Sequence, residues 1–150
     1  GWCASPLQQL VLVDAALHQD LVRFRDLAAL ACTDAVRGAW LRRFADARAQ
    51  SPLETLARYA LVRSGFSVEP QVLFEGIGWV DLLVEGVVVV ETDGRRYHSA
   101  DPSFQRDRDR DAELQMLGLA VLRFTYADVV GRPDKIVSRV RRTLDARGVS

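Results

Sequence analysis

The stretch VVVVETDG, residues 87–94, decides the fold because a continuous apolar run is followed directly by acidic residues. Four consecutive valines predict a β-strand that is buried on both faces, as in the middle of a sheet covered by helices. Alternate side chains of a strand share a face, so we expect Glu91 and Asp93 to point the same way. A carboxylate in such a place is costly unless a cation or hydrogen-bond donors stabilise it. The stretch therefore predicts a polar site at one end of a buried strand.

A third acidic residue, Asp81, lies in the apolar segment just before this strand. If the two segments form a hairpin with a two-residue loop, Asp81 faces Val90, and Glu91 lies on the other side of the sheet. A three-residue loop at residues 85–87, or a bulge, instead brings Asp81 and Glu91 to one face. Gly86 permits the left-handed backbone that such a loop needs. A single acidic site therefore predicts an irregular hairpin.

The composition is that of a globular domain with room for a sizeable core. The chain has 150 residues, of which 49% are hydrophobic and 27% charged. The net charge is zero, so any nucleic-acid surface must be a local patch. No apolar segment approaches the roughly 20 residues of a membrane span, and no signal peptide is visible, so we expect a cytoplasmic protein with no membrane partner. Two histidines exclude a His-rich zinc site. The start at Gly1 favours a piece of a longer protein.

Hydrophobic periodicity divides the chain into a helical extension, residues 1–50, and an α/β (α+β) domain, residues 51–150. Ser51 and Pro52 suit the N-cap and the first position of a helix that runs to about Arg63. The domain pattern then predicts a mixed β-sheet flanked by helices. Its expected strands are 66–72, 79–84, 87–92 and 119–124, and its further helices are 101–117 and 134–147.

The acidic residues Asp81, Glu91 and Asp93 form a candidate metal site. Magnesium prefers oxygen ligands, commonly one or two carboxylates with water and phosphate oxygens. His98 follows in the loop after the acidic strand and, with a near-neutral pKa, suits a general base. The alternative is that the acids are solvated strand ends and that His98 is a surface residue.

Charged residues also lie on the inward side of the helix expected at 101–117. Counting back in helical steps from Leu114 gives Asp111, Arg110 and Asp107, which we expect to brace the site. The alternative is a solvated helix with Asp–Arg pairs. Arg95 and Arg96, in the preceding loop, are candidates for phosphate contacts.

The ordered combination of these segments resembles the very-short-patch-repair-like endonuclease family of the PD-(D/E)XK restriction-endonuclease-like superfamily. The resemblance covers about residues 51–130 and rests on the segments Ser51–Glu54, Val80-Asp81, Val90–His98, Phe104–Asp111 and Val121–Thr125. It implies a restriction-endonuclease-like fold and hydrolysis of DNA phosphodiesters with Mg²⁺ or Mn²⁺. Residues 6–48 resemble the helical spacer of longer relatives, which carry an N-terminal winged-helix module.

Under this resemblance Asp81 corresponds to the central metal-binding aspartate, Glu91 to the next acid and Glu54 to the acid of the first helix. His98 is similar to the loop histidine that assists hydrolysis. The superfamily lysine is replaced by Asp93, so a second hypothesis is a non-catalytic module that binds DNA or protein. Glu54 has an alternative role in a capping box with its helix N-terminus. A third reading is a structural ion-pair network of the acids with Arg110 and Arg123.

Overall fold

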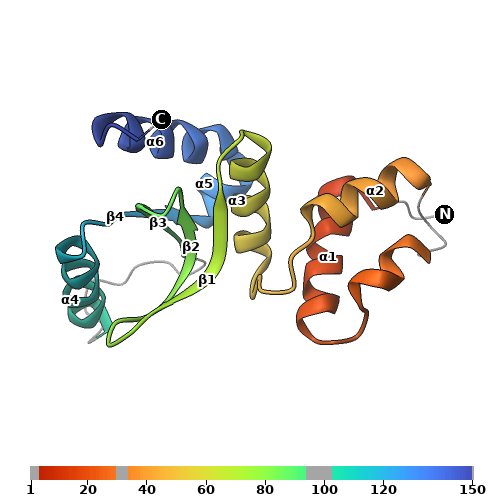
Figure 1. The fold of residues 1–150 in the computed structure, drawn as a ribbon, viewed down its shortest axis with the longest axis horizontal. Coiled ribbons are helices and arrows are strands. Elements are labelled where there is room, and N and C mark those ends of the chain that lie inside the picture. Colours follow the sequence, from red (N-terminus) through yellow and green to blue (C-terminus); the bar gives the residue numbers. More distant parts are fainter. Residues whose placement is uncertain (1–3, 30–33, 94–102, 150) are drawn as a thin grey trace.

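The structure, a computed structural model, describes residues 4–29, 34–93 and 103–149. Its elements follow the chain from a helical N-terminal part into a sheet with flanking helices (Figure 1). They are α1 (Pro6–His18), the 3₁₀ helix η1 (Phe24–Ala29), α2 (Ala35–Phe44), α3 (Pro52–Arg63), β1 (Val68–Phe74), β2 (Gly78–Val84), β3 (Val88–Asp93), α4 (Ser103–Met116), β4 (Ala120–Thr125), α5 (Tyr126–Gly131) and α6 (Pro133–Ala146).

The four strands form one mixed sheet in the order β1-β2-β3-β4. The first three are antiparallel neighbours, while β4 returns after α4 and pairs parallel to β3. This confirms the predicted mixed sheet flanked by helices. Pro70 lies in β1, an edge strand, where its missing N–H is tolerated.

The valine strand lies in the interior, as predicted. Val88, Val89 and Val90 are fully buried. Val88 and Val90 pack into a core with α3, α5 and α6, whereas Val89 packs into a smaller core with Leu114 of α4. Helices therefore cover both faces of β3, with α4 on the opposite side of the sheet from α6 (Figure 1).

The hairpin between β2 and β3 has the three-residue loop that a single acidic site requires. Val84 pairs with Val88, so residues 85–87 form the loop, and Val87 N donates to Val84 O. Glu85 and Gly86 both have positive φ, 49° and 69°. The expectation of an irregular hairpin is confirmed.

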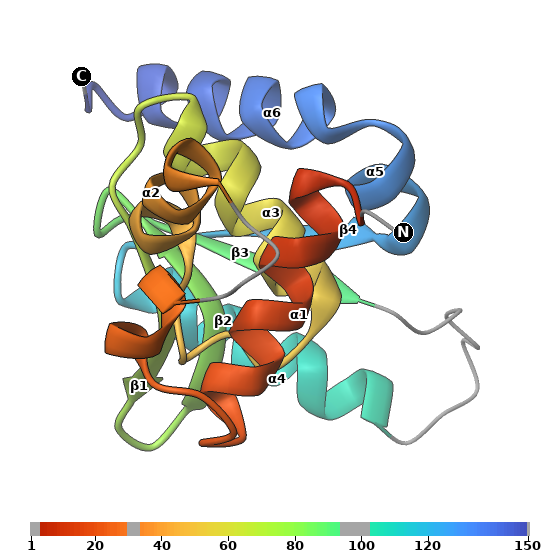
Figure 2. The same cartoon turned by 90° about the vertical axis from the view of Figure 1, so that its right-hand side faces the viewer.

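The helical extension packs on α3 through its own small core (Figure 2). Trp40 and Phe44 of α2 form an aromatic cluster with Tyr59 of α3. Beside it, Asp14 of α1 forms a buried ion pair with Arg58 of α3, with Nη2 and Oδ2 2.8 Å apart. The extension is therefore anchored to the helix that begins the sheet domain, while the division at residue 50 stays a prediction.

One element of the structure, α5, was not predicted from the sequence. This helix has six residues, and one and a half turns are too short to show a helical period. Its N-cap Thr125 and Asp128 form a capping box. The predicted cap Asp101 of helix 101–117 lies outside the described residues. No helix in the described ranges is long and apolar enough to cross a membrane.

Candidate functional site

Four polar residues lie in one row across the sheet, one from each strand. Glu91 of β3 pairs with Arg123 of β4. The β2–β3 pairing ends at Leu82 and Val90, so Asp81 and Glu91 are the next residues of the two strands, and the charge of Asp81 acts on Glu91. Gln71 of β1, between residues that pair with β2, lies opposite Asp81. The sheet thus brings Asp81 and Glu91 to neighbouring positions, as the sequence argument required.

The strands twist sharply at this row. Val68 and Val84 pack with α3 and α6, but Val72 and Val80 pack with Leu114 on the α4 side. The β1–β2 ribbon therefore changes face near Gln71, whose φ of 52° lies in the left-handed region. A non-glycine residue in that conformation is uncommon.

Asp81 lies where the backbone pairing of β2 and β3 ends, and its side chain bonds the next part of β3. Beyond Leu82 and Val90 the backbone ladder stops, and Asp81 Oδ2 accepts hydrogen bonds from Thr92 N at 2.8 Å and Thr92 Oγ1 at 2.9 Å. The Asp81 side chain thus bonds Thr92 on the side of β2, where Thr92 has no backbone partner. Oδ1 has no hydrogen-bond partner among the described residues and is the oxygen available to a ligand.

Glu91 is a buried carboxylate with an incomplete set of partners. Its residue is 8% exposed, and Oε1 lies 2.9 Å from Arg110 Nη1. The ion pair lacks hydrogen-bond geometry, so Oε1 is buried without a hydrogen bond within the described part of the chain. Burial first, and the negative charge of Asp81 second, raise the pKa of the Glu91 carboxyl above its ordinary value of 4.5, against the opposing effect of Arg110 and Arg123.

Helix α4 supplies the charged side chains predicted to brace the site. Arg110 contacts Glu91 and also donates from Nη2 to the Trp79 carbonyl. Asp111 accepts two hydrogen bonds from Arg123, at 3.2 Å from Nε and 2.7 Å from Nη2. Of the ion-pair network considered as a third hypothesis, the pair of Arg110 with Glu91 is therefore formed, while Arg123 pairs with Asp111, which was not one of its predicted partners. Asp107 belongs to α4, but its side chain lies outside the described part.

Glu54 reaches the row from α3 through Gln71. Its Oε2 accepts from Gln71 Nε2 and from Gln50 N, both at 2.9 Å, in a residue only 4% exposed. Ser51 caps the helix by accepting from Glu54 N, but the carboxylate bonds the backbone of Gln50 rather than that of Ser51. The reciprocal capping box, which was the alternative role for Glu54, is therefore not formed.

The donor set fits a divalent cation as a pair of carboxylates. Asp81 Oδ1 and Glu91 Oε1 each lack a hydrogen bond to the described residues, and the charge of Asp81 raises the pKa of the Glu91 carboxyl. Hard cations suit oxygen donors of this kind. Within residues 4–29, 34–93 and 103–149, no group of three or more His, Cys, Asp and Glu gathers as a metal cluster. Asp93 ends β3 without completing such a group, and His98, Arg95 and Arg96 lie outside the described residues.

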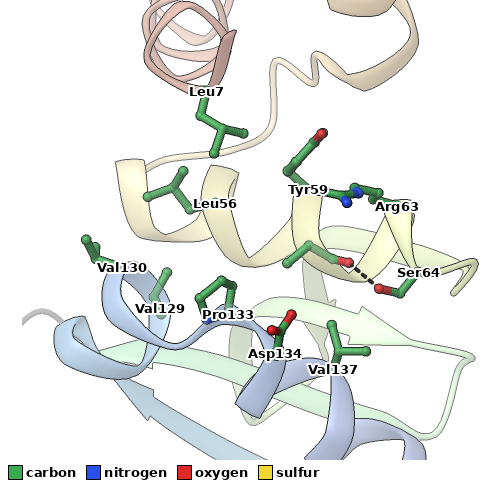
Figure 3. Close-up of a pocket in the computed structure, with 11 residues that line it drawn as sticks. Leu7, Leu56, Tyr59, Arg63, Ser64, Val129, Val130, Pro133, Asp134 and Val137 are labelled. Carbon is green, nitrogen blue, oxygen red and sulfur yellow. Dashed lines mark hydrogen bonds between the residues drawn. The ribbon is translucent and has the colours of Figure 1, made fainter. Parts of the chain in front are cut away.

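A separate cavity of about 330 Å³ lies between α3, α5 and α6 and is closed on one side by Leu7 of α1 (Figure 3). Its walls are mainly apolar, although Arg63 and Asp134 also line it. The Ser64 hydroxyl donates a hydrogen bond to the Ala60 carbonyl. It contains none of the acidic site residues. The cavity and the acidic row are therefore separate features of the described structure.

Two site residues were missed by the sequence argument. Gln71 links Glu54 to the row, and Thr92 donates twice to Asp81. No spacing marks Gln71, because its role depends on a left-handed backbone and on a helix elsewhere in the chain. Thr92 had one available signal, its position between the two acids of β3.

The comparisons with known proteins agree with this architecture. The sequence model of the restriction-endonuclease family REase_MTES_1575 matches residues 53–144. Two uncharacterised proteins of Mycobacterium tuberculosis, MT2308 of strain CDC 1551 / Oshkosh and Rv2248 of strain ATCC 25618 / H37Rv, are each 30% identical over 112 residues, 68% of this chain. The matched region spans 40% of the length of each relative. No solved structure matches the chain. The chain belongs to the restriction-endonuclease-like family REase_MTES_1575.

Proposed function

We propose that this chain hydrolyses DNA phosphodiester bonds with a divalent metal ion, Mg²⁺ or Mn²⁺, held by Asp81 and Glu91. The observation that carries the proposal is the juxtaposition of two carboxylates on neighbouring strands, one of them buried, ion-paired with Arg110 and subject to the charge of the other. Membership of a restriction-endonuclease-like family supports DNA as the substrate. The more specific likeness to very-short-patch-repair endonucleases is part of the proposal.

Each residue of the site has a distinct task under this proposal. When bound, the ion supplies charge stabilisation at the scissile phosphate and favours ionisation of water. Asp81 Oδ1 and Glu91 Oε1 hold it, whereas Asp93 does not complete a group of three carboxylates with them in the described structure. Glu54, fixed by Gln71, positions a water, and Arg110 limits the repulsion between the two acids.

The residues of the following loop and helix face the substrate in this proposal. His98 acts as the base that takes the proton of the attacking water. Arg95 and Arg96 contact phosphates, which position the DNA without reading its sequence. Asp107 and Asp111 brace this side, and for Asp111 the bidentate pair with Arg123 supports that role.

A second candidate function is a non-catalytic DNA- or protein-binding module. Asp93 stands where the resembled superfamily has lysine, and Arg110 already neutralises Glu91 as a built-in cation. Under this alternative the row stabilises the fold. DNA binding is then indifferent to chelators and survives loss of Asp81.

The test compares metal binding and cleavage in matched variants. We expect calorimetry to detect one Mn²⁺ site in the wild type, lost in Asp81→Asn and Glu91→Gln but kept in Glu75→Gln, an exposed acid of the β1–β2 turn. Supercoiled, single-stranded and mismatched DNA are then incubated with Mg²⁺, Mn²⁺ or EDTA. Cleavage should need the metal and fall about 100-fold or more in the two site variants. Absence of metal binding and of cleavage of all three substrates contradicts the nuclease proposal.

A further inference from the structure

An open groove of about 510 Å³ runs between α6 and β4, on the sheet face opposite to α4. Strand β4 is the last of the sheet, so the groove follows an edge of the molecule. Three arginines, Arg139, Arg142 and Arg147, line it together with small or apolar residues. The other lining residues are Ala120, Leu122, Thr143 and Ala146.

Helix α6 and the residue that follows it place the three arginines along the groove. Arg139, Arg142, Thr143 and Ala146 follow the i, i+3, i+4, i+7 spacing and so form one stripe of α6. The Arg139 guanidinium lies 5.6 Å from the centre of the Phe124 ring. This contact covers one face of the guanidinium. Arg147 donates from Nη1 to the Gly118 carbonyl and keeps its remaining donors.

The positive charge of the groove is not neutralised by the protein. Within the described part of the chain, none of these arginines has a carboxylate within ion-pair distance, and no acidic residue is among those that line the groove. The nearby Asp145 lines a different hollow together with Arg141. Three like charges side by side in a protein with zero net charge indicate an anionic ligand.

The shape of the groove distinguishes a polyanion from a small anion. It is open and partly apolar, and two of its arginines are exposed, so nothing encloses a single ion. Arginine is suited to phosphate because its planar fork donates two parallel hydrogen bonds. Edge strand β4 also connects the groove to the acidic row, since Leu122 lines the groove and the next residue, Arg123, belongs to the row.

We propose that the groove formed by Arg139, Arg142 and Arg147 binds backbone phosphates of DNA, as a second contact surface apart from the acidic row. The proposal rests on the proposed function in that DNA is the ligand of both, but it needs neither metal nor cleavage. Contacts of this kind carry affinity and no sequence information. The structural alternative is that the arginines only shield an edge strand from pairing with other chains.

The test is the salt dependence of DNA binding, measured by anisotropy of a labelled 20-base-pair duplex in EDTA. The double variant Arg142→Gln, Arg147→Gln is compared with the wild type and with Arg42→Gln, which removes one exposed arginine from α2. We expect the slope of log K against log salt to become shallower by about 2 in the double variant, at about 0.9 per lost phosphate contact, and affinity to fall at every salt concentration. Arg42→Gln should leave the slope unchanged.

The outcomes separate the groove from the acidic site. An unchanged slope in the double variant, no duplex binding by the wild type, or aggregation of the double variant with unchanged DNA affinity overturns the groove proposal. If the double variant loses affinity while the wild type shows no metal-dependent cleavage, the groove proposal stands and the nuclease proposal fails. If the wild type cleaves DNA and the double variant binds DNA with unchanged affinity and salt dependence, only the groove proposal fails.

Discussion

Glu91 Oε1 and Arg110 Nη1 are 2.9 Å apart, yet their ion pair leaves the carboxylate oxygen without a hydrogen bond in the described structure. The guanidinium is directed in part to the Trp79 carbonyl, so it compensates the charge of Glu91 without fully satisfying it. A positive side chain thus lies at the carboxylate that the proposed metal ion uses. Arg110 and the ion compete for Glu91, and this competition can be measured.

Substitution of Arg110 by glutamine should destabilise the metal-free protein and increase its response to metal. Without the guanidinium, only the more weakly acting Arg123 opposes the repulsion between ionised Glu91 and Asp81, and we expect a loss of about 1–3 kcal/mol in the free energy of unfolding in EDTA. Saturating Mn²⁺ should then raise Tm more in Arg110→Gln than in the wild type, since the ion no longer displaces an internal cation.

Arg42→Gln is the matched control for this experiment, because it removes an exposed arginine far from the sheet. It should change neither the stability in EDTA nor the Mn²⁺-induced shift. Equal Tm shifts for the wild type and Arg110→Gln contradict competition at Glu91. They favour an ion-pair network that has no part in metal binding.

The raised pKa of Glu91 predicts a pH dependence of stability with a definite sign. Burial and the charge of Asp81 raise the pKa in the folded protein above 4.5, so near this range the native state binds more protons than the unfolded chain. Metal-free stability should therefore fall as pH rises from about 4.5 through the folded pKa. Glu91→Gln has no such titrating group. In urea unfolding in EDTA, the free energy of unfolding of the variant should therefore rise relative to that of the wild type between pH 4.5 and 8.

Metal should reverse this trend, because a divalent ion binds the ionised carboxylate. With Mn²⁺ present, the stability gained by the wild type should increase with pH, while Glu91→Gln should gain little at any pH. Parallel stability curves for the two proteins in EDTA are the result that contradicts the assigned role of burial at Glu91.

Much of this site could be predicted from sequence because local patterns determine it. Four valines sufficed to place β3 inside, and strand parity reduced the meeting of Asp81 and Glu91 to the length of one loop. The helical stripe that ends at Leu114 placed Arg110 and Asp111 on the side of the sheet. In each case the deciding interactions lie within one element or between adjacent strands.

The remaining features depend on contacts between distant segments. The conformation of Gln71 follows from the twist of a hairpin and a hydrogen bond to Glu54, 17 residues away. The Asp14–Arg58 pair joins helices 44 residues apart, and no charge pattern identifies it. The contacts of these residues form only when distant segments pack together, so the periodicity of the sequence could not identify them.

The Asp14–Arg58 pair predicts a large stability effect far from the acidic row. Both side chains are almost fully buried, and Asp14 also accepts from Thr55 Oγ1 and Asp46 N. Arg58→Met leaves an uncompensated buried carboxylate, and we expect a loss of about 3–5 kcal/mol in urea unfolding. Adding Asp14→Asn should recover part of that loss, since the buried charge is then removed.

The exposed pair of Arg48 and Asp46, also at 2.8 Å, provides the comparison. Arg48→Met should cost only about 0–1 kcal/mol, because solvent screens that pair. A loss below about 1 kcal/mol for Arg58→Met, or a double variant less stable than Arg58→Met alone, would mean that the pair does not anchor the extension on α3.

The loop that aligns the two acids can be tested at Gly86. Its φ of 69° strains any residue with a Cβ, so Gly86→Ala should cost about 1–2 kcal/mol in the free energy of unfolding. Gly131→Ala is the matched control, because Gly131 has no positive φ and a Cβ there meets no atom within 4 Å. It should be neutral or stabilise slightly by restricting the unfolded chain. Because the three-residue loop sets the register of Asp81 against Glu91, Mn²⁺ affinity should fall in Gly86→Ala and stay unchanged in Gly131→Ala. Equal affinities with a destabilised loop would show that the register of the two acids does not depend on Gly86.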